Sequence, residues 1–276
     1  MFNTTIVAHI LAKKSLLCVG LDPDPAHMPA ALREHPDALF RFCATLIEAL
    51  DDLVCAFKPN IAFFEAYGSS GIAALERLCA LPRRTPLILD AKRGDIGTTA
   101  AAYAQLIFDR LDADAVTLSP YLGSESLAPF LRHAERGCFV LCRTSNNSAG
   151  DLQDLRLADG RPLYHEVARL ARDIWNSNGN VGLVAGATRP EELRSIRRLC
   201  PGLPLLVPGV GAQGGDLAAA VAAAIDADGA GALISVSRAV LYASSGADYL
   251  DAARAAARDL RDAINAVRGA RGSEML

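Results

Sequence analysis

The sequence lacks a strong charge of either sign and has no long hydrophobic run. Its 28 basic and 31 acidic residues give a formal net charge of −3, which excludes the basic footprint that nucleic-acid binding usually requires. No run approaches the roughly 18 apolar residues needed to span a bilayer, and the N-terminus lacks the basic and apolar regions of a signal peptide. These absences predict a cytoplasmic protein with no nucleic-acid or membrane partner.

The sequence also lacks the cysteine and histidine spacings that are typical of metal and redox sites. The seven cysteines include no CxxC pair, and the five histidines are scattered without ligand spacing. Cys18, Cys55, Cys138 and Cys142 fall within apolar runs, where cysteine behaves as a small hydrophobic residue. We therefore expect reduced thiols, as in the cytosol, and no metal site.

What the chain does have is a repeated alternation of apolar runs and helical patterns. With 276 residues and 51% hydrophobic composition, it has ample apolar material for one large domain. Most of the apolar runs are continuous, as expected for parallel strands covered on both faces. The expected strands are 16–21, 54–59, 86–90, 115–119, 138–143, 181–186, 205–209 and 232–237. Eight such alternations predict an α/β fold, a single-domain TIM (β/α)8 barrel over residues 1–276. An open doubly wound sheet is the alternative, but no Gly-x-Gly-x-x-Gly follows the first strand.

The segments between the strands divide into helices and two long loops. Helical patterns occupy 37–50, 98–111, 162–176, 216–225 and 248–267, and residues 269–276 are expected to form a frayed tail. The connections 23–36 and 144–160 are longer than a barrel requires. Because binding function concentrates in long loops after barrel strands, we expect both to lie near a ligand.

A charged run directly follows the third apolar run. Asp90, Lys92 and Asp95 come after residues 86–89. A strand alternates its faces, so Asp90 and Lys92 should point the same way. Such a cluster would be costly inside a core, but it can meet a ligand at the C-terminal mouth of a barrel. Taken alone, the pattern also fits a solvated turn with an incidental salt bridge.

The first and second strands add charges to the same rim. Asp22 directly follows the first strand, and Lys58 lies at the end of the second. In a closed barrel, these two residues would project into the mouth together with Asp90 and Lys92. The four would then form an ion network whose members perturb one another's pKa values, a signature of functional sites.

The ends of the seventh and eighth strands predict a phosphate site. The glycine-rich segment 209–215 contains Gln213, and Arg238 follows the eighth strand. Loops at these two positions commonly bind phosphate in TIM barrels, since glycines let backbone N–H groups approach the anion. Arg238 can bind a phosphate through two hydrogen bonds, and the Gln213 amide can donate another. A flexible turn is the alternative for the glycine-rich segment.

Together these motifs resemble the orotidine 5'-phosphate decarboxylase family. The matching segments, in the family's order, are 21–23, 57–60, 90–99, 143–146, 208–215 and 237–238. The length and the Lys-Arg form of the central motif resemble the longer bacterial branch. The resemblance implies a carboxy-lyase that needs no cofactor and converts orotidine 5'-phosphate to uridine 5'-phosphate (UMP) and CO2. This reaction is the last step of de novo pyrimidine biosynthesis.

The resemblance also implies roles for individual residues. Its catalytic residues would be Lys58, Asp90, Lys92 and Asp95, with Lys92 as the proton donor. It implies a homodimer in which Asp95 of one subunit completes the site of the other, with Ile96 and Thr99 beside it. The substrate-binding residues that it implies are Asp22, Thr99, Ser145, Pro208, Gly209, Gln213, Ser237 and Arg238.

Two rival interpretations remain at this point. Sugar-phosphate aldolases and decarboxylases that act through a magnesium-bound enediolate share Asp-x-Lys-x-x-Asp on the third strand. They tend to carry a metal-binding acid where this chain has Lys58, and they lack its 144–146 segment. The other rival is a non-catalytic nucleotide-phosphate binder. The intact set of acids and lysines argues against it, because without catalysis nothing requires these charges to stay together.

Overall fold

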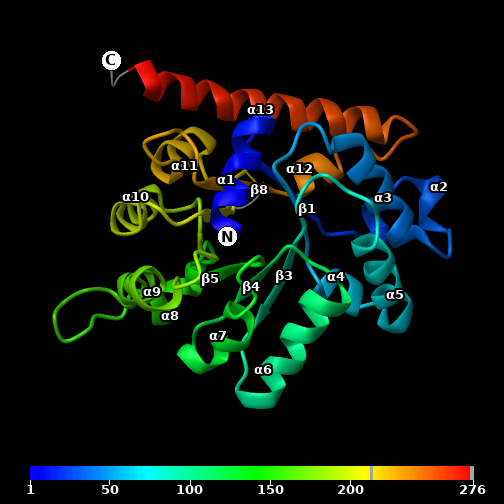
Figure 1. The fold of residues 1–276 in the computed structure, drawn as a ribbon. Helices are drawn as coiled ribbons and strands as arrows, with labels where there is room; N and C mark the ends of the chain where they lie inside the picture. The colour runs from blue at the N-terminus through cyan, green and yellow to red at the C-terminus, as the bar shows by residue number, and fades with distance from the viewer. Residues whose placement is uncertain (212–213, 274–276) are drawn as a thin grey trace.

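Eight parallel strands pair in the order β2-β1-β8-β7-β6-β5-β4-β3. The computed structural model describes residues 1–211 and 214–273 (Figure 1). The strands are β1 (Leu17–Leu21), β2 (Ala56–Pro59), β3 (Ile88–Arg93), β4 (Ala115–Leu118), β5 (Gly137–Arg143), β6 (Val181–Ala185), β7 (Leu205–Pro208) and β8 (Ala232–Val236). Their side chains are almost all buried, as the continuously apolar runs predicted.

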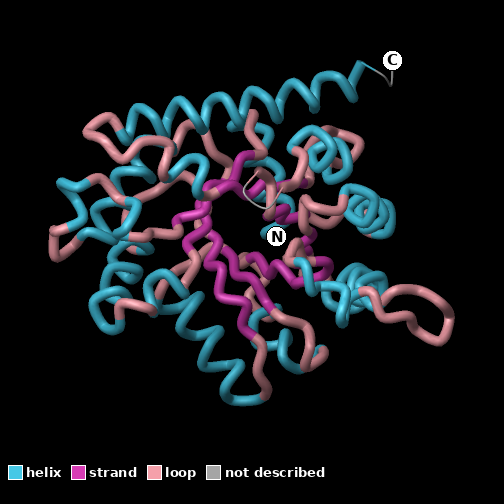
Figure 2. The backbone as a smooth tube through the Cα atoms, turned by 180° about the vertical axis from the view of Figure 1, so that it is seen from behind, coloured by secondary structure: helices cyan, strands magenta, loops and turns pink. Residues whose placement is uncertain are grey.

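The two outer strands of this order, β2 and β3, meet and bring the sheet close to a full ring. Parallel bridges join Phe57 to Leu87 and Asn60 to Asp90. In Figure 2 the strands surround the centre of the molecule, with helices outside them. The predicted single-domain TIM barrel is therefore confirmed, and the C-terminal ends of the strands share one mouth.

The helices cover the outside of the ring. They are α1 (Phe2–Lys13), α2 (Ala30–Arg33), α3 (Ala38–Leu50), α4 (Ala62–Glu65), α5 (Gly68–Cys79), α6 (Gly97–Ala104), α7 (Ser124–Leu131), α8 (Gly150–Gln153), α9 (Leu163–Leu170), α10 (Pro190–Leu199), α11 (Leu217–Ala224), α12 (Arg238–Leu241) and α13 (Tyr249–Ser273). π-helical segments, Gln105–Arg110 and Ala171–Trp175, extend α6 and α9. Among the described residues, no helix is both long and apolar enough to cross a membrane.

Helix α1, for which the sequence analysis made no prediction, packs across the N-terminal ends of β5 and β6. The Phe2 ring meets the Phe139 ring edge to face at 6.1 Å. The Asn3 side chain donates a hydrogen bond to the carbonyl of Val181 (2.9 Å). This helix therefore covers the barrel at the end opposite the mouth.

Two elements, β3 and α13, continue beyond the C-terminal ends that the sequence analysis predicted. The third strand was predicted to end at Asp90, which is wrong, because β3 pairs with β4 as far as Arg93. The amide of Ser119 donates to the Arg93 carbonyl at 2.8 Å and holds this end of the strand. Helix α13 continues to Ser273, well into the segment expected to fray, and residues 274–276 lie outside the described residues.

Candidate active site

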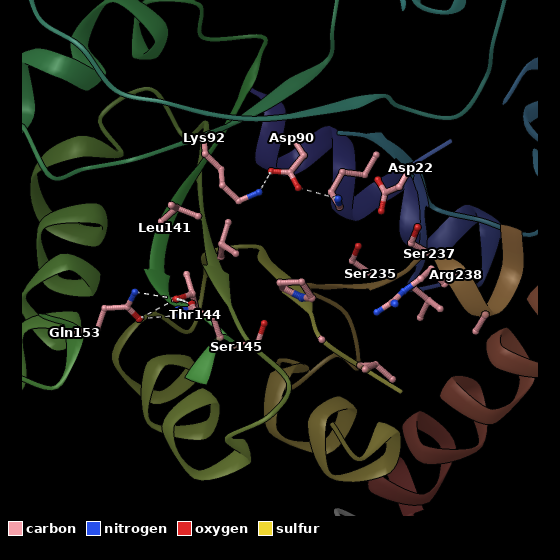
Figure 3. A pocket seen from close by; sticks show the side chains of 18 residues that line it. Asp22, Asp90, Lys92, Leu141, Thr144, Ser145, Gln153, Ser235, Ser237 and Arg238 are labelled. Atoms are coloured by element: carbon pink, nitrogen blue, oxygen red, sulfur yellow. Dashed lines mark hydrogen bonds and ion pairs between the residues drawn. The ribbon is translucent and has the colours of Figure 1, made fainter. Parts of the chain in front are cut away.

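A cavity of about 520 Å³ opens at the C-terminal ends of the strands (Figure 3). Its wall contains nine of the residues predicted from the sequence. They are Asp22, Lys58, Asp90, Lys92, Ser145, Pro208, Gly209, Ser237 and Arg238. Side chains from distant parts of the chain thus meet at one mouth, as the barrel topology requires.

Asp90 lies at the centre of the charged side of the cavity. Its Oδ2 accepts a hydrogen bond from Lys58 Nζ at 3.0 Å, and its Oδ1 accepts one from Lys92 Nζ at 2.7 Å. Asp90 and Lys58 are buried, whereas half of the Lys92 side chain is exposed to the cavity. Lys58, Asp90 and Lys92 therefore form an ion-paired cluster, and its more exposed lysine, Lys92, faces the cavity.

The two lysines keep the Asp90 carboxyl ionised. Burial raises the pKa of Asp90, but the positive charges of Lys58 and Lys92 outweigh burial and hold it well below its usual range. Burial lowers the pKa of Lys58, but the charges of Asp90 and Asp22 outweigh it, so this pKa is raised. Each buried charge is thus stabilised by an opposite charge that the protein itself supplies.

Lys92 reaches the cavity through an irregular backbone, rather than through simple alternation along the strand. Its φ of 46° lies in the left-handed region, which is uncommon for a residue other than glycine. The pairing of β3 with β4 shifts register between Leu89 and Arg93. Asp90 and Lys92 share a direction as predicted, but a local distortion of the strand places them there. Such strain is characteristic of functional sites.

Thr117 on β4 supports this geometry, and the sequence analysis assigned it no role. Its hydroxyl donates to Asp90 Oδ1 at 2.8 Å and accepts from the backbone N–H of Lys92 at 3.0 Å. It is almost fully buried. One side chain therefore fixes both the carboxylate and the distorted backbone of Lys92. The available signal in the sequence was a hydroxyl residue inside an otherwise apolar strand next to β3.

Asp22 lines the cavity but does not join the ion pairs. Its Oδ1 is buried and has no hydrogen-bond partner among the described residues. Its backbone carbonyl accepts from the Tyr242 hydroxyl at 2.8 Å, which holds the end of β1 in place. The expected four-membered network is therefore a bonded trio with Asp22 nearby, and Asp22 is a further acidic residue in the cavity wall.

The opposite side of the cavity consists of backbone turns and one cation. Gly209 has a φ of 97°, which favours glycine, and it follows β7 directly. Ser237 and Arg238 follow β8, and within the described chain no carboxylate pairs with the Arg238 guanidinium. Gln213, predicted to bind phosphate, lies outside the described residues. The placement of Gly209, Ser237 and Arg238 fits an anion.

A third part of the wall comes from β5, β6 and the segment after β5. Thr144, Ser145 and Asn146 line it with polar groups, and Leu141 and Val184 line it with apolar ones. Gln153, from α8, lies beside Thr144 (Figure 3). A flat ring with polar edges can lie against such a surface.

Asp95 and Thr99 do not line the cavity of their own chain. Asp95 Oδ1 accepts from the amide of the next residue, Ile96, at 2.8 Å. Thr99 lies exposed on α6, and the Ile96 side chain is 51% exposed. The neighbouring Arg93 points away from the cavity to Glu65, with 2.8 Å between Nη2 and Oε1.

The described residues include no group of three or more His, Cys, Asp or Glu side chains arranged to hold a metal ion. Acid and amine groups are instead paired with one another around Asp90. The fold and the site together define a TIM-barrel protein with an ion-paired, ligand-sized cavity at the C-terminal mouth of the barrel.

The chain belongs to the orotidine 5'-phosphate decarboxylase / HUMPS family, whose model matches residues 15–255. An orotidine 5'-phosphate decarboxylase of Roseiflexus castenholzii is 63% identical over 92% of this chain and 93% of its own length. The structure of Leishmania donovani OMP decarboxylase has a TM-score of 0.85 and 46% identity, covering 97% of this chain and 99% of that one. Leishmania donovani UMP synthase has a TM-score of 0.86 and 48% identity, and the match covers 96% of this chain but 56% of that longer chain.

Proposed function

We propose that the protein decarboxylates orotidine 5'-phosphate to UMP and CO2, as the last step of de novo pyrimidine biosynthesis. The observation that carries the proposal is the placement of Asp90 between Lys58 and Lys92 in the same cavity as Arg238. The family relationship and the names of the relatives support it. Lys92 can supply an ammonium group to the carbon that loses CO2, and Arg238 can supply a positive charge to the phosphate.

In this proposal Lys92 is the proton donor. Loss of CO2 leaves negative charge on C6 of the pyrimidine, which no neighbouring carbonyl delocalises simply. The Lys92 ammonium stabilises the charge as it develops and then delivers a proton to C6. Its exposure to the cavity and its 2.7 Å bond to Asp90 support this role, because Asp90 aims the ammonium and is itself held by Lys58.

Asp90 lies near the substrate carboxylate in this arrangement. Two like charges about 4 Å apart at an effective dielectric near 20 repel by about 4 kcal/mol, which corresponds to roughly three orders of magnitude in rate. Because Lys58 and Lys92 pair with Asp90, they offset part of that repulsion. Most of the acceleration must then come from Lys92 and from substrate positioning through the phosphate.

We propose that substrate binding divides among the remaining walls of the cavity. Arg238, Ser237 and the turn at Pro208 and Gly209 hold the phosphate, with Gln213 closing over it. Ser145 contacts the pyrimidine, and the carboxylate of Asp22, which lines the cavity, accepts a hydrogen bond from a ribose hydroxyl. No step in this scheme requires a cofactor.

The complete site is proposed to require a homodimer. Asp95, Ile96 and Thr99 lie together on the loop and helix after β3, outside the cavity of their own chain. A twofold partner can supply Asp95 to the other site, since the same surface meets itself in such a dimer. A cytoplasmic location is proposed with it, and the seven free cysteines fit a reducing compartment.

The test of the reaction is turnover of orotidine 5'-phosphate in EDTA, followed by ultraviolet absorbance of the pyrimidine, for wild type and Lys92→Ala. Wild type should consume the substrate, and the variant should lose at least about four orders of magnitude in kcat. Absence of turnover in wild type would overturn the proposal. Turnover that requires added magnesium would favour the enediolate chemistry instead.

The dimer is tested by mixing two inactive chains. Lys92→Ala and Asp95→Ala, each inactive alone, should regain about a quarter of the wild-type activity when co-expressed in equal amounts. When the chains pair at random, half of the dimers contain one chain of each variant. Each of these dimers has one intact site out of two, so a quarter of all sites are intact. No recovery in mixed dimers isolated with two affinity tags would contradict a shared site.

A further inference from the structure

The long connection after β5 turns back to the strand end from which it starts. It contains α8, and Gln153 at the end of that helix lies at the cavity wall beside Thr144. Thr144 donates its backbone N–H to Gln153 Oε1 at 2.8 Å. Gln153 donates its Nε2 to the Thr144 hydroxyl, also at 2.8 Å. Both ends of the amide are therefore engaged by one residue of the wall.

A buried arginine anchors the same connection. Arg143, the last residue of β5, is only 4% exposed, and its Nη1 donates to the Thr144 carbonyl at 3.1 Å. Its Nη2 pairs with Asp154 at 3.1 Å, and its Nε lies 2.9 Å from Glu192 of α10. Two carboxylates from different elements thus neutralise a buried guanidinium, which fixes the residue that follows Gln153.

The other side of the segment is confined by the backbone after β6. The amide of Gly186 donates to the Arg143 carbonyl at 2.7 Å, and a Cβ at Gly186 would come within 2.8 Å of Ser145. The Thr188 hydroxyl donates to the Ser145 carbonyl at 3.3 Å. Ser145 therefore has backbone on one side and the Thr144–Gln153 pair on the other, with little freedom to shift.

We propose that Gln153 is a positioning residue for recognition of the pyrimidine, a role that rests on the proposed function. It acts through Thr144 to hold Ser145 and Asn146 against the base. The Thr144 hydroxyl is oriented by Gln153, so it donates in turn to Asn146 Oδ1 at 2.6 Å. In Figure 3 Gln153 and Thr144 lie on one side of the cavity, whereas Ser237 and Arg238 lie on another. The effect of Gln153 should therefore fall on the base and spare the phosphate.

The test separates these two parts of the ligand. Gln153→Met keeps the length of the side chain and removes both hydrogen bonds, and Gln153→Glu keeps an acceptor for the Thr144 N–H. The matched control is Asp151→Asn, an exposed change on the same short helix. Binding of UMP and of ribose 5-phosphate is measured by calorimetry for each protein, and kcat and KM are measured for orotidine 5'-phosphate.

Gln153→Met should bind UMP about tenfold more weakly and bind ribose 5-phosphate within twofold of wild type. Gln153→Glu should recover only part of the loss, because it can accept from the Thr144 N–H but cannot donate to the Thr144 hydroxyl, and the control should match wild type. Equal losses for both ligands, or no loss for UMP, would overturn the positioning role. A wild type that binds UMP but does not turn over orotidine 5'-phosphate would overturn the proposed reaction, while the comparison of ligands would still decide the role of Gln153.

Discussion

The two sides of the cavity satisfy their polar groups in different ways. Around β2 and β3, Lys58, Asp90 and Lys92 form a bonded cluster, and two of the three are buried. Around β7 and β8, the wall consists of a glycine turn, a serine and the exposed Arg238, which pairs with no carboxylate of the described chain. The charged side pairs its groups within the chain, whereas we propose that Arg238 on the other side pairs with the phosphate of the ligand.

This difference separates preorganisation from recognition. In the proposed reaction, charges that act on a developing carbanion are most effective when no reorganisation is needed at that moment, and the ion pairs around Asp90 fit this requirement. A cation that captures a phosphate must instead remain accessible. Mutations on the two sides should therefore produce different kinetic signatures, and the following predictions test that separation.

The largest effect is expected on the charged side. Asp90→Asn leaves Lys58 buried without a carboxylate and removes the group that aims Lys92, so kcat should fall by about three orders of magnitude or more. The free energy of unfolding should fall by about 3–5 kcal/mol, because a buried charge loses its partner. Steady-state kinetics and thermal unfolding measure the two effects. Asp37→Asn, which breaks an exposed pair with Arg77, is the control and should leave kcat unchanged. A normal kcat in Asp90→Asn would contradict the preorganised cluster.

A smaller effect is expected at the phosphate side. Arg238→Ala removes a charge-assisted contact worth about 1.5–3 kcal/mol, so ligand affinity should fall roughly 10- to 100-fold. Calorimetric titration with UMP and with ribose 5-phosphate should give similar losses, unlike Gln153→Met. Arg258→Ala, an exposed arginine on α13, is the matched control. If Arg238→Ala weakened UMP alone, the assignment of this side to the phosphate would be wrong.

The smallest effect is expected in the acid dependence of stability. The pKa of Asp90 is lower in the folded chain than in the unfolded one, so its stabilisation is fully present above the unfolded value of about 3.9. That contribution is lost as the pH falls below this value toward the folded pKa, at no more than about 1.4 kcal/mol per pH unit. Urea unfolding between about pH 5 and pH 3 should therefore show a shallower slope for Asp90→Asn than for wild type. Parallel curves would show that the carboxylate gains nothing from its lysines.

Much of the charged side could be predicted from the sequence, because each member lies at the end of a recognisable apolar run. Asp90, Lys92 and Lys58 are adjacent to strand ends, and the barrel topology brings strand ends to one mouth. Thr117 and Gln153 could not be found this way. Thr117 lies within a strand, where threonine is common, so its type alone does not mark it as part of the site. Gln153 reaches the cavity wall only because the connection after β5 folds back onto the end of that strand.

The sequence by itself determined the number and order of the strands, the rim on which the charges lie and the family to which the chain belongs. These properties follow from local hydrophobic patterns and from residue types at strand ends. The tertiary structure alone decided how those residues interact. The register shift and the positive φ at Lys92 occur where β3 pairs with β4. Asp22 lies outside the bonded trio, and the Tyr242 hydroxyl holds its backbone through a hydrogen bond to the Asp22 carbonyl. Such details depend on contacts between segments far apart in the chain, which no local pattern encodes.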